Sequence, residues 1–154
     1  MNRISKENYY LDIAETVLER ATCLRRIHGA IIVKNDEIIS TGYNGAPRGR
    51  ANCVDLGYCS REAMQVPRGE RYELCRSVHA EANAVLNYRG SLKDLEGSTV
   101  YVTLFPCHDC AKILAQVGVG EVVYLDNKYA DTDDGRISRR ILDSCGISYR
   151  QVIV

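Results

Sequence analysis

The sequence contains no tryptophan, one phenylalanine and only three prolines, and its charges cancel. Lys plus Arg number 20 and Asp plus Glu number 20, so the chain has no global positive field. Proteins that bind long nucleic acids usually present a basic face, so this balance argues against a polynucleotide ligand. It leaves room for a small anion held by a few local arginines. We also find no low-complexity tract and no interdomain linker.

A long hydrophobic run is also missing, because no stretch of about eighteen apolar residues exists. Residues 1–10 are too polar for a signal peptide. We therefore expect no membrane association and a cytoplasmic location, where thiols stay reduced. In a reducing compartment, seven cysteines favour metal binding or catalysis over disulfide bonds.

The 154 residues are expected to form one domain, 1–154, because this length suits a single core. Helical and strand patterns alternate in the order α-β-β-α-β-α-β-α-β. This order predicts an α/β fold with helices on both faces of a sheet, mostly parallel after an initial hairpin. The expected helices are 5–24, 78–89, one opened by Pro106 and one marked by Ile137, Ile141 and Cys145; the expected strands are 29–33, 37–43, 98–104, 121–125 and 147–154.

Local signals mark where these helices begin and end. Ser5 and Ser77 are the expected N-caps of the first two helices, and Gly90 is expected to end the second. Cys145 is expected to face the core from the last helix. The interval 44–76 has no helical or strand periodicity, so we expect an irregular, cysteine-containing insertion within the domain.

Four residues with the chemistry of a metal centre stand at two helix starts. They are His79 and Glu81 on one helix and Cys107 and Cys110 on the next. A Cys-x-x-Cys pair at a helix start can point both sulfurs at one ion, and the helix dipole favours thiolates there. With His79 added, zinc has three protein ligands and an open position, the pattern of catalytic zinc. Such zinc lowers the pKa of bound water from about 15.7 to about 7, and Glu81 is placed to carry protons.

Simpler explanations exist for each part of this motif. A single histidine in a first turn is usually a surface or core residue, and a lone Cys-x-x-Cys also occurs in redox centres and zinc ribbons. The full order H-x-E…P-C-x-x-C is hard to obtain by chance and is the signature of zinc-dependent nucleobase deaminases. We expect His28 and His108 to be spacer residues.

Three segments carry a narrower likeness: STGYNGAPRG (40–49), SVHAEANAVL (77–86) and VYVTLFPCHDCAKIL (100–114). They resemble the deoxycytidylate (dCMP) deaminase family within the cytidine-deaminase superfamily, and the resemblance extends over about residues 9–150. It implies a three-layer α/β/α fold with a five-stranded mixed sheet. It also implies zinc-dependent hydrolysis of dCMP to dUMP and ammonia, a step of pyrimidine nucleotide synthesis.

The same resemblance implies roles for residues outside the metal motif. Asn44 would bond the deoxyribose 3′-hydroxyl, while the Ala80 backbone and the turn that ends at Pro106 would hold the base. Tyr129 would contact substrate or activator. Six basic side chains could reach a phosphate, and the sequence does not rank them: Arg25, Arg26, Arg48, Arg50, Arg76 and Lys128.

Family members are commonly hexamers that are activated by dCTP and inhibited by dTTP, and Mg²⁺ would accompany such a nucleotide. The resemblance places an effector site near Gly42, Tyr43, Gly45, Arg48 and Arg50. Glycines let backbone N–H groups approach phosphate, and arginines add positive charge. The alternative is an ordinary glycine-rich turn after a strand.

Cys23, Cys53, Cys59 and Cys75 could form a second, structural zinc site that orders the interval 44–76. The resemblance adds that some dCMP deaminases hold such a zinc with two cysteines, matching Cys23 and Cys53, and with histidines. Here Cys59 and Cys75 stand in the region of those histidines. The alternative is that the four cysteines are small buried apolar residues.

Two other functions stay open. Another zinc deaminase could act on dCTP, cytidine, guanine, a riboflavin precursor or tRNA adenosine, although zero net charge argues against tRNA. A non-catalytic zinc-binding module is the alternative from another class. The presence of Glu81 favours an enzyme, since a purely structural site does not need it.

Overall fold

The computed structural model describes residues 2–153 of the chain. Met1 and Val154 lie outside the described residues, so the ends of the predicted domain 1–154 and of the predicted last strand are not tested. Within residues 2–153, no helix combines the length and the apolar character that a membrane crossing requires.

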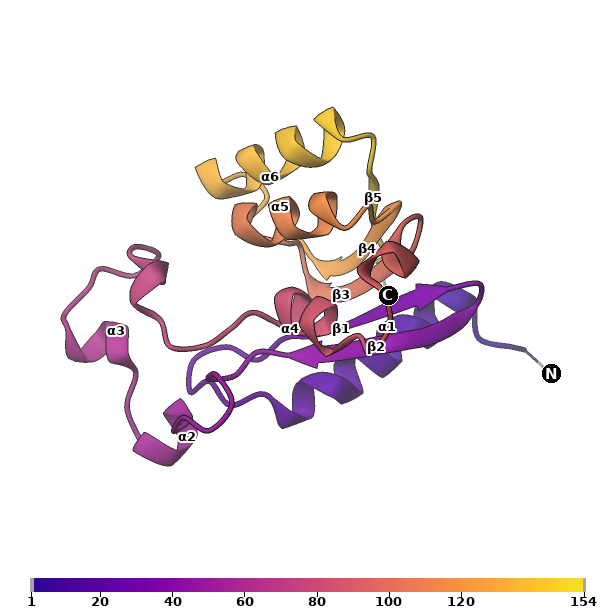
Figure 1. The fold of residues 1–154 in the computed structure, drawn as a ribbon. Helices are drawn as coiled ribbons and strands as arrows, with labels where there is room; N and C mark the ends of the chain where they lie inside the picture. Colours follow the sequence, from indigo (N-terminus) through magenta and orange to yellow (C-terminus); the bar gives the residue numbers. More distant parts are fainter. Residues whose placement is uncertain (1, 154) are drawn as a thin grey trace.

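A five-stranded mixed sheet in the order β2-β1-β3-β4-β5 forms the centre of the fold (Figure 1). Its strands are β1 (Gly29–Lys34), β2 (Glu37–Tyr43), β3 (Thr99–Leu104), β4 (Glu121–Asp126) and β5 (Ser148–Gln151). β1 pairs antiparallel with β2 and β3, whereas β4 is parallel to both β3 and β5. The predicted hairpin and mixed sheet are therefore confirmed.

Helices cover both faces of this sheet, as the alternation predicted. They are α1 (Lys6–Val17), α4 (Ala80–Asn87), α5 (His108–Gln116) and α6 (Asp133–Ser144). Figure 1 shows α1 on one side of the sheet and α5 and α6 on the other. Leu11 of α1 packs with Ile31 and Val123 on one face, while Leu114 and Leu142 pack on the opposite face.

A two-residue turn closes the β1–β2 hairpin. Asn35 and Asp36 adopt positive φ angles of 52° and 61°, the conformation of a type I′ turn, whose twist matches that of the strands. The Tyr10 hydroxyl donates to the Asp36 carboxylate over 2.6 Å, which ties α1 to the turn. This contact raises the pKa of Tyr10 to about 12.

The helix boundaries differ from the prediction in ways that matter for the site. Ser5 caps α1 as expected, but α1 ends at Val17 and a 3₁₀ turn, η1 (Leu18–Arg20), follows it. Ser77 is not the cap of α4. Val78 forms an antiparallel bridge with Gly45, with N–O distances of 2.7 and 3.1 Å, so the chain is still extended there.

His79 is consequently the N-cap of α4, which ends at Asn87 with Tyr88 as its C-cap, earlier than the predicted stop at Gly90. In the same way α5 begins two residues after Pro106, with Cys107 as its N-cap. Each of these two helices therefore starts directly after a candidate metal ligand, and that ligand has an extended backbone.

The interval 44–76 is more ordered than its sequence pattern predicts, and Figure 1 shows it reaching away from the sheet. It contains α2 (Cys53–Leu56), α3 (Ser60–Ala63) and the 3₁₀ turn η2 (Tyr72–Leu74). The buried Arg61 guanidinium donates twice to the Glu70 carbonyl, at 2.7 and 3.0 Å, and lies 4.0 Å from the Tyr72 ring centroid. Side-chain contacts, not periodicity, organise this segment.

The buried face of α6 is also displaced from the predicted one. Gly135, Ser138 and Leu142 are buried, whereas Ile137 is exposed. Cys145 follows the last helical residue and is exposed, so the expectation that it belongs to the core is wrong.

Candidate active site

The candidate site lies at the sheet edge where β3 ends and β1 begins. The N-termini of α4 and α5 meet there, and His79 and Cys107 precede the two helices with ψ angles of 156° and 169°. Neither side chain caps its own helix. Both are therefore free to turn toward a common point.

The structure brings together His79, Cys107 and Cys110, whose ligand atoms all lie within 4.8 Å of one another. His79 Nδ1 is 3.3 Å from Cys107 Sγ and 3.4 Å from Cys110 Sγ. A tetrahedral zinc with typical Zn–N and Zn–S bonds would separate nitrogen from sulfur by about 3.5 Å. The donor set and its spacing therefore fit a zinc ion without a change of fold.

Of these side chains, the Cys107 thiol has the ionisation that suits a cation, whereas His79 and Cys110 would each release a proton on binding one. Hydrogen bonding, mainly from Cys110 and also from His79, lowers the pKa of the Cys107 thiol to about 4. The bond to Cys107 raises the pKa of His79 to about 9. Cys107 is thus held as a thiolate at the start of a helix, where the dipole adds to its stabilisation.

Glu81 lies in the first turn of α4 and is only 6% exposed. Burial, followed by the negative charge of Cys107, raises the pKa of its carboxyl to about 7. Within residues 2–153, it is not among the side chains whose ligand atoms meet within 4.8 Å. A carboxyl group with this pKa can both accept and donate a proton near neutral pH.

The residues expected to hold a substrate base and sugar lie next to this group. Ala80 is the first residue of α4, Pro106 directly precedes Cys107, and both are buried. Asn44 follows β2 and is 6% exposed. Its amide bonds the backbone of the segment 26–28, a role that the sequence did not reveal.

A cationic group with an aromatic centre lies nearby. The Arg26 guanidinium carbon is 4.6 Å from the Tyr129 ring centroid, and Lys128 Nζ is 5.3 Å from it. The Tyr129 hydroxyl is buried without a hydrogen-bond partner in the described part of the chain. Burial and the positive charges of Arg26, His79 and Lys128 lower the pKa of His28 to about 4, so this group adjoins the candidate metal ligands.

His108, which we expected to be a spacer, keeps a side chain that is 40% exposed, but it also has a partner that the sequence did not indicate. Its backbone N–H donates to Asp134 Oδ1 over 3.4 Å, and its ring forms a short contact with the same carboxylate. Asp134 lies in the first turn of α6, so this pair joins the start of α6 to the Cys107–Cys110 turn. The acidic start of α6 is visible in the sequence, but nothing there identifies its partner.

Three of the five predicted effector residues have a structural role or partner. A Cβ on Gly42 would lie 2.3 Å from the Ala84 nitrogen, so this glycine allows α4 to pack on β2. Gly45 uses its N–H in the bridge to Val78. Arg48 Nη2 donates to Asn87 Oδ1 over 2.9 Å. Tyr43 lies at the end of β2, and Arg50 is exposed.

The four remaining cysteines expected to bind metal gather around the insertion. Cys53 and Cys59 are buried, and Cys23 and Cys75 are partly buried. Burial raises the pKa of Cys53, and the neighbouring Cys23, Cys75 and Cys59 raise it further. In residues 2–153, however, no three of these sulfurs lie within 4.8 Å of one another.

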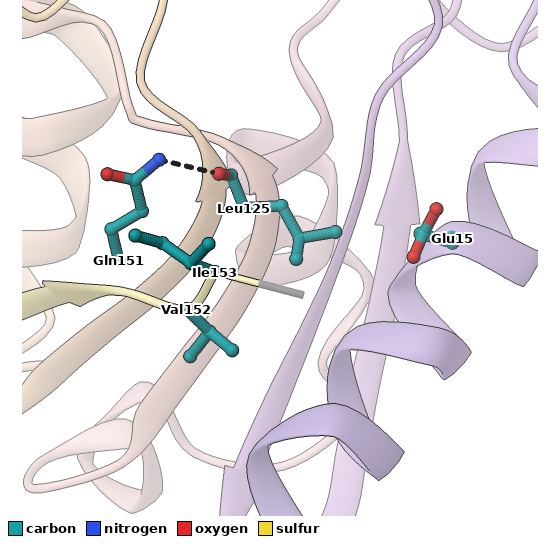
Figure 2. Close-up of a pocket in the computed structure, with 5 residues that line it drawn as sticks. All are labelled: Glu15, Leu125, Gln151, Val152 and Ile153. Atoms are coloured by element: carbon teal, nitrogen blue, oxygen red, sulfur yellow. Dashed lines mark hydrogen bonds between the residues drawn. The ribbon is translucent and has the colours of Figure 1, made fainter.

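A pocket of about 430 Å³ lies elsewhere, between α1 and the ends of β4 and β5 (Figure 2). Glu15, Leu125, Gln151, Val152 and Ile153 line it, and Gln151 donates to the Leu125 carbonyl over 3.0 Å. None of these described lining residues is a cysteine, histidine or arginine, so they offer no thiolate, imidazole or guanidinium like those of the His79 group.

Comparisons with known proteins agree with this geometry. Residues 4–126 match the family described as the cytidine and deoxycytidylate deaminase zinc-binding region. The chain is 38% identical over 128 residues to the probable deoxycytidylate deaminase of Drosophila melanogaster, covering 83% of this chain and 62% of that protein. It is 40% identical over 129 residues to the deoxycytidylate deaminase of Mycobacterium phage D29, covering 80% of this chain and 97% of that protein.

A solved structure shares the whole fold. The dCMP deaminase of cyanophage S-TIM5, crystallised with dCMP and dUMP, superposes with a TM-score of 0.73 at 29% identity, over 97% of this chain and 100% of that one. The chain therefore belongs to the cytidine and deoxycytidylate deaminase family, a family of hydrolytic deaminases.

Proposed function

We propose that the chain catalyses the hydrolytic deamination of dCMP to dUMP and ammonia. The convergence of His79, Cys107 and Cys110 beside the buried Glu81 carries this proposal, because it supplies three ligands and an uncoordinated acid. The three residues would hold zinc, which when bound activates the water that adds to the ring carbon. The phage proteins named above support dCMP as the substrate.

Glu81 moves the protons in this reaction. It takes one proton from the attacking water and delivers it to the ring nitrogen. It then takes the second proton from the new hydroxyl and gives it to the departing amine as the C–N bond breaks, which leaves the carbonyl of dUMP and ammonia. Ala80 and Pro106 border the space in which the base would lie, and Asn44 would contribute the sugar contact. These assignments rest on position beside the metal group.

Arg26, Lys128 and Tyr129 favour a nucleotide over a nucleoside. Two cations lie over one aromatic ring, and the Tyr129 hydroxyl is buried without a hydrogen-bond partner among residues 2–153. A phosphate accepts several charge-assisted hydrogen bonds, so it would suit this group better than an uncharged sugar would. We assign the substrate phosphate to Arg26 first, with Lys128 and Tyr129 as supporting contacts.

A substrate panel tests this assignment. The protein should turn over dCMP with kcat/KM about 10²-fold or more above that for deoxycytidine, and Arg26→Ala should remove most of this preference. The exposed Arg20 provides the control, since Arg20→Ala should change neither value. Activity on dCTP, cytidine or a tRNA anticodon stem in place of dCMP would support another zinc deaminase, and no activity at all would support the non-catalytic module.

We also propose a second, structural zinc at Cys23, Cys53, Cys59 and Cys75. Cys23, Cys75 and Cys59 each raise the pKa of Cys53, and this proximity of the four thiols supports the proposal. Sulfurs bound to one zinc lie about 3.8 Å apart, so these side chains would move closer together when the metal binds. Four thiolates would leave no open coordination position, so this metal would have no direct part in the reaction.

Metal analysis should find two zinc ions per chain. Cys53→Ser should reduce the content to one and should make the segment 44–76 more susceptible to proteolysis, because structural zinc contributes folding free energy. The exposed Ser144 offers a control, since Ser144→Ala should keep both ions. A content of one zinc in the unmodified protein would contradict the second site.

Regulation is the third part of the proposal. dCTP would activate and dTTP would inhibit through the region of Gly42, Tyr43, Gly45, Arg48 and Arg50. Both arginines are exposed there, and Gly45 is held by its bridge to Val78. Mg²⁺ would enter only with the nucleotide. Repeating the panel with dCTP and dTTP tests this idea, and unchanged rates and saturation curves would refute it. Assembly as a hexamer and a cytoplasmic location remain predictions.

A further inference from the structure

Asn44 uses all four of its polar groups on one short segment, residues 22–28. Its side-chain Oδ1 accepts from the His28 N–H over 2.7 Å, and Nδ2 donates to the Arg26 carbonyl over 2.9 Å. Its backbone N–H donates to the His28 carbonyl over 3.4 Å, and its carbonyl accepts from Thr22 over 3.1 Å. An amide is suited to this task because it carries a donor and an acceptor on one short planar group.

The segment held in this way carries two side chains of the site. Arg26 reaches the Tyr129 ring, and His28 lies among Arg26, His79, Lys128 and Asp126. Ile27 between them is exposed. The segment lies between η1 and β1 and has no regular structure of its own. The Asn44 amide is therefore the side chain that joins its backbone to the end of β2.

We propose that Asn44 is a positioning residue, which holds the backbone of residues 26–28 so that the Arg26 guanidinium stands where the substrate phosphate binds. This inference rests on the proposed function, because it assumes a nucleotide substrate. It goes beyond the sugar contact that the family resemblance implies. The amide nitrogen and the amide oxygen each make one hydrogen bond to the protein. The second hydrogen of Nδ2 and the second lone pair of Oδ1 are left for a ligand.

Three substrates separate the two roles of Asn44. Asn44→Ala should lower kcat/KM for dCMP by about 10- to 100-fold, mainly through KM. The same loss should appear with 2′,3′-dideoxy-CMP, which has the phosphate but no 3′-hydroxyl. With deoxycytidine, which has the hydroxyl but no phosphate, the loss should shrink to about threefold or less. A residue that only bonds the 3′-hydroxyl predicts the reverse pattern.

A double-mutant cycle with Arg26→Ala adds a second readout. If Asn44 acts through Arg26, the Asn44→Ala substitution should lower kcat/KM for dCMP only slightly further in an Arg26→Ala background, because the two effects are not independent. Gln151→Ala is the matched control, since this side-chain amide also donates to a backbone carbonyl but lies in the pocket of Figure 2. Gln151→Ala should leave kcat/KM unchanged for all three substrates.

Asn44→Ser protects the test against a folding failure. It removes the side-chain contacts with Arg26 and His28 without adding a buried charge, so it should show the same dependence on the phosphate, and retained zinc with retained turnover of deoxycytidine would show that the variant is folded. Loss of the effect with the dideoxy substrate would overturn the inference while dCMP turnover still supports the proposed function. Absence of turnover in the unmodified protein would overturn both.

Discussion

Replacement of Glu81 by glutamine is expected to lower kcat for dCMP by about 10²- to 10⁴-fold while the zinc content stays unchanged. Glutamine has the same shape as glutamate, so it fits the buried position in the first turn of α4 without creating a cavity. It has no ionisable proton, however. The variant therefore removes proton transfer and keeps the packing.

The measurement is the ultraviolet change from dCMP to dUMP together with metal analysis of the same sample. Glu19→Gln is the matched control, because Glu19 is an exposed carboxylate in η1, and its replacement should change neither quantity. Full activity in the Glu81 variant would exclude it as the proton carrier. Loss of zinc along with activity would instead make Glu81 a ligand.

Replacement of Cys110 by serine is expected to release the zinc of the His79 group and to reduce activity by a factor on the order of 10³ or more. Cys110 is buried in the first turn of α5, and its sulfur lies 3.4 Å from His79 Nδ1. Serine nearly matches its size, but its hydroxyl is not a thiolate ligand. Two ligands would remain, and the site would lose the metal that activates water.

Metal content distinguishes the two zinc sites in this experiment. Cys110→Ser should remove one ion with most of the activity, whereas Cys53→Ser should remove one ion with most of the activity kept. The exposed Cys145 supplies the control, since Cys145→Ser alters a thiol distant from both groups in the sequence and should change neither zinc nor rate. An active, zinc-loaded Cys110→Ser variant would show that Cys110 is not a ligand.

The sequence predicted the sheet well because the signals for its elements are local. The turn at Asn35 and Asp36 and the β-branched runs on either side of it specify a hairpin without help from the rest of the chain. The exact starts of α4 and α5 depend on distant contacts. Val78 stays extended because Gly45, more than thirty residues earlier, pairs with it.

The insertion and the end of α6 show the same limit. The segment 44–76 has no periodicity, yet the buried Arg61 and its contacts with Glu70 and Tyr72 give it a defined form. Spacing placed Cys145 on an apolar face, but the helix ends before it and leaves it exposed.

By itself, the sequence determined the order of the elements, the family and the candidate ligands His79, Cys107 and Cys110, because each of these depends on residues that are close along the chain. Only the tertiary structure decided that Asn44 holds the segment 26–28 and that Arg26 faces Tyr129. These contacts join loops from separate parts of the chain. Such contacts form only when the sheet brings the ends of its strands together, so no local sequence pattern predicts them.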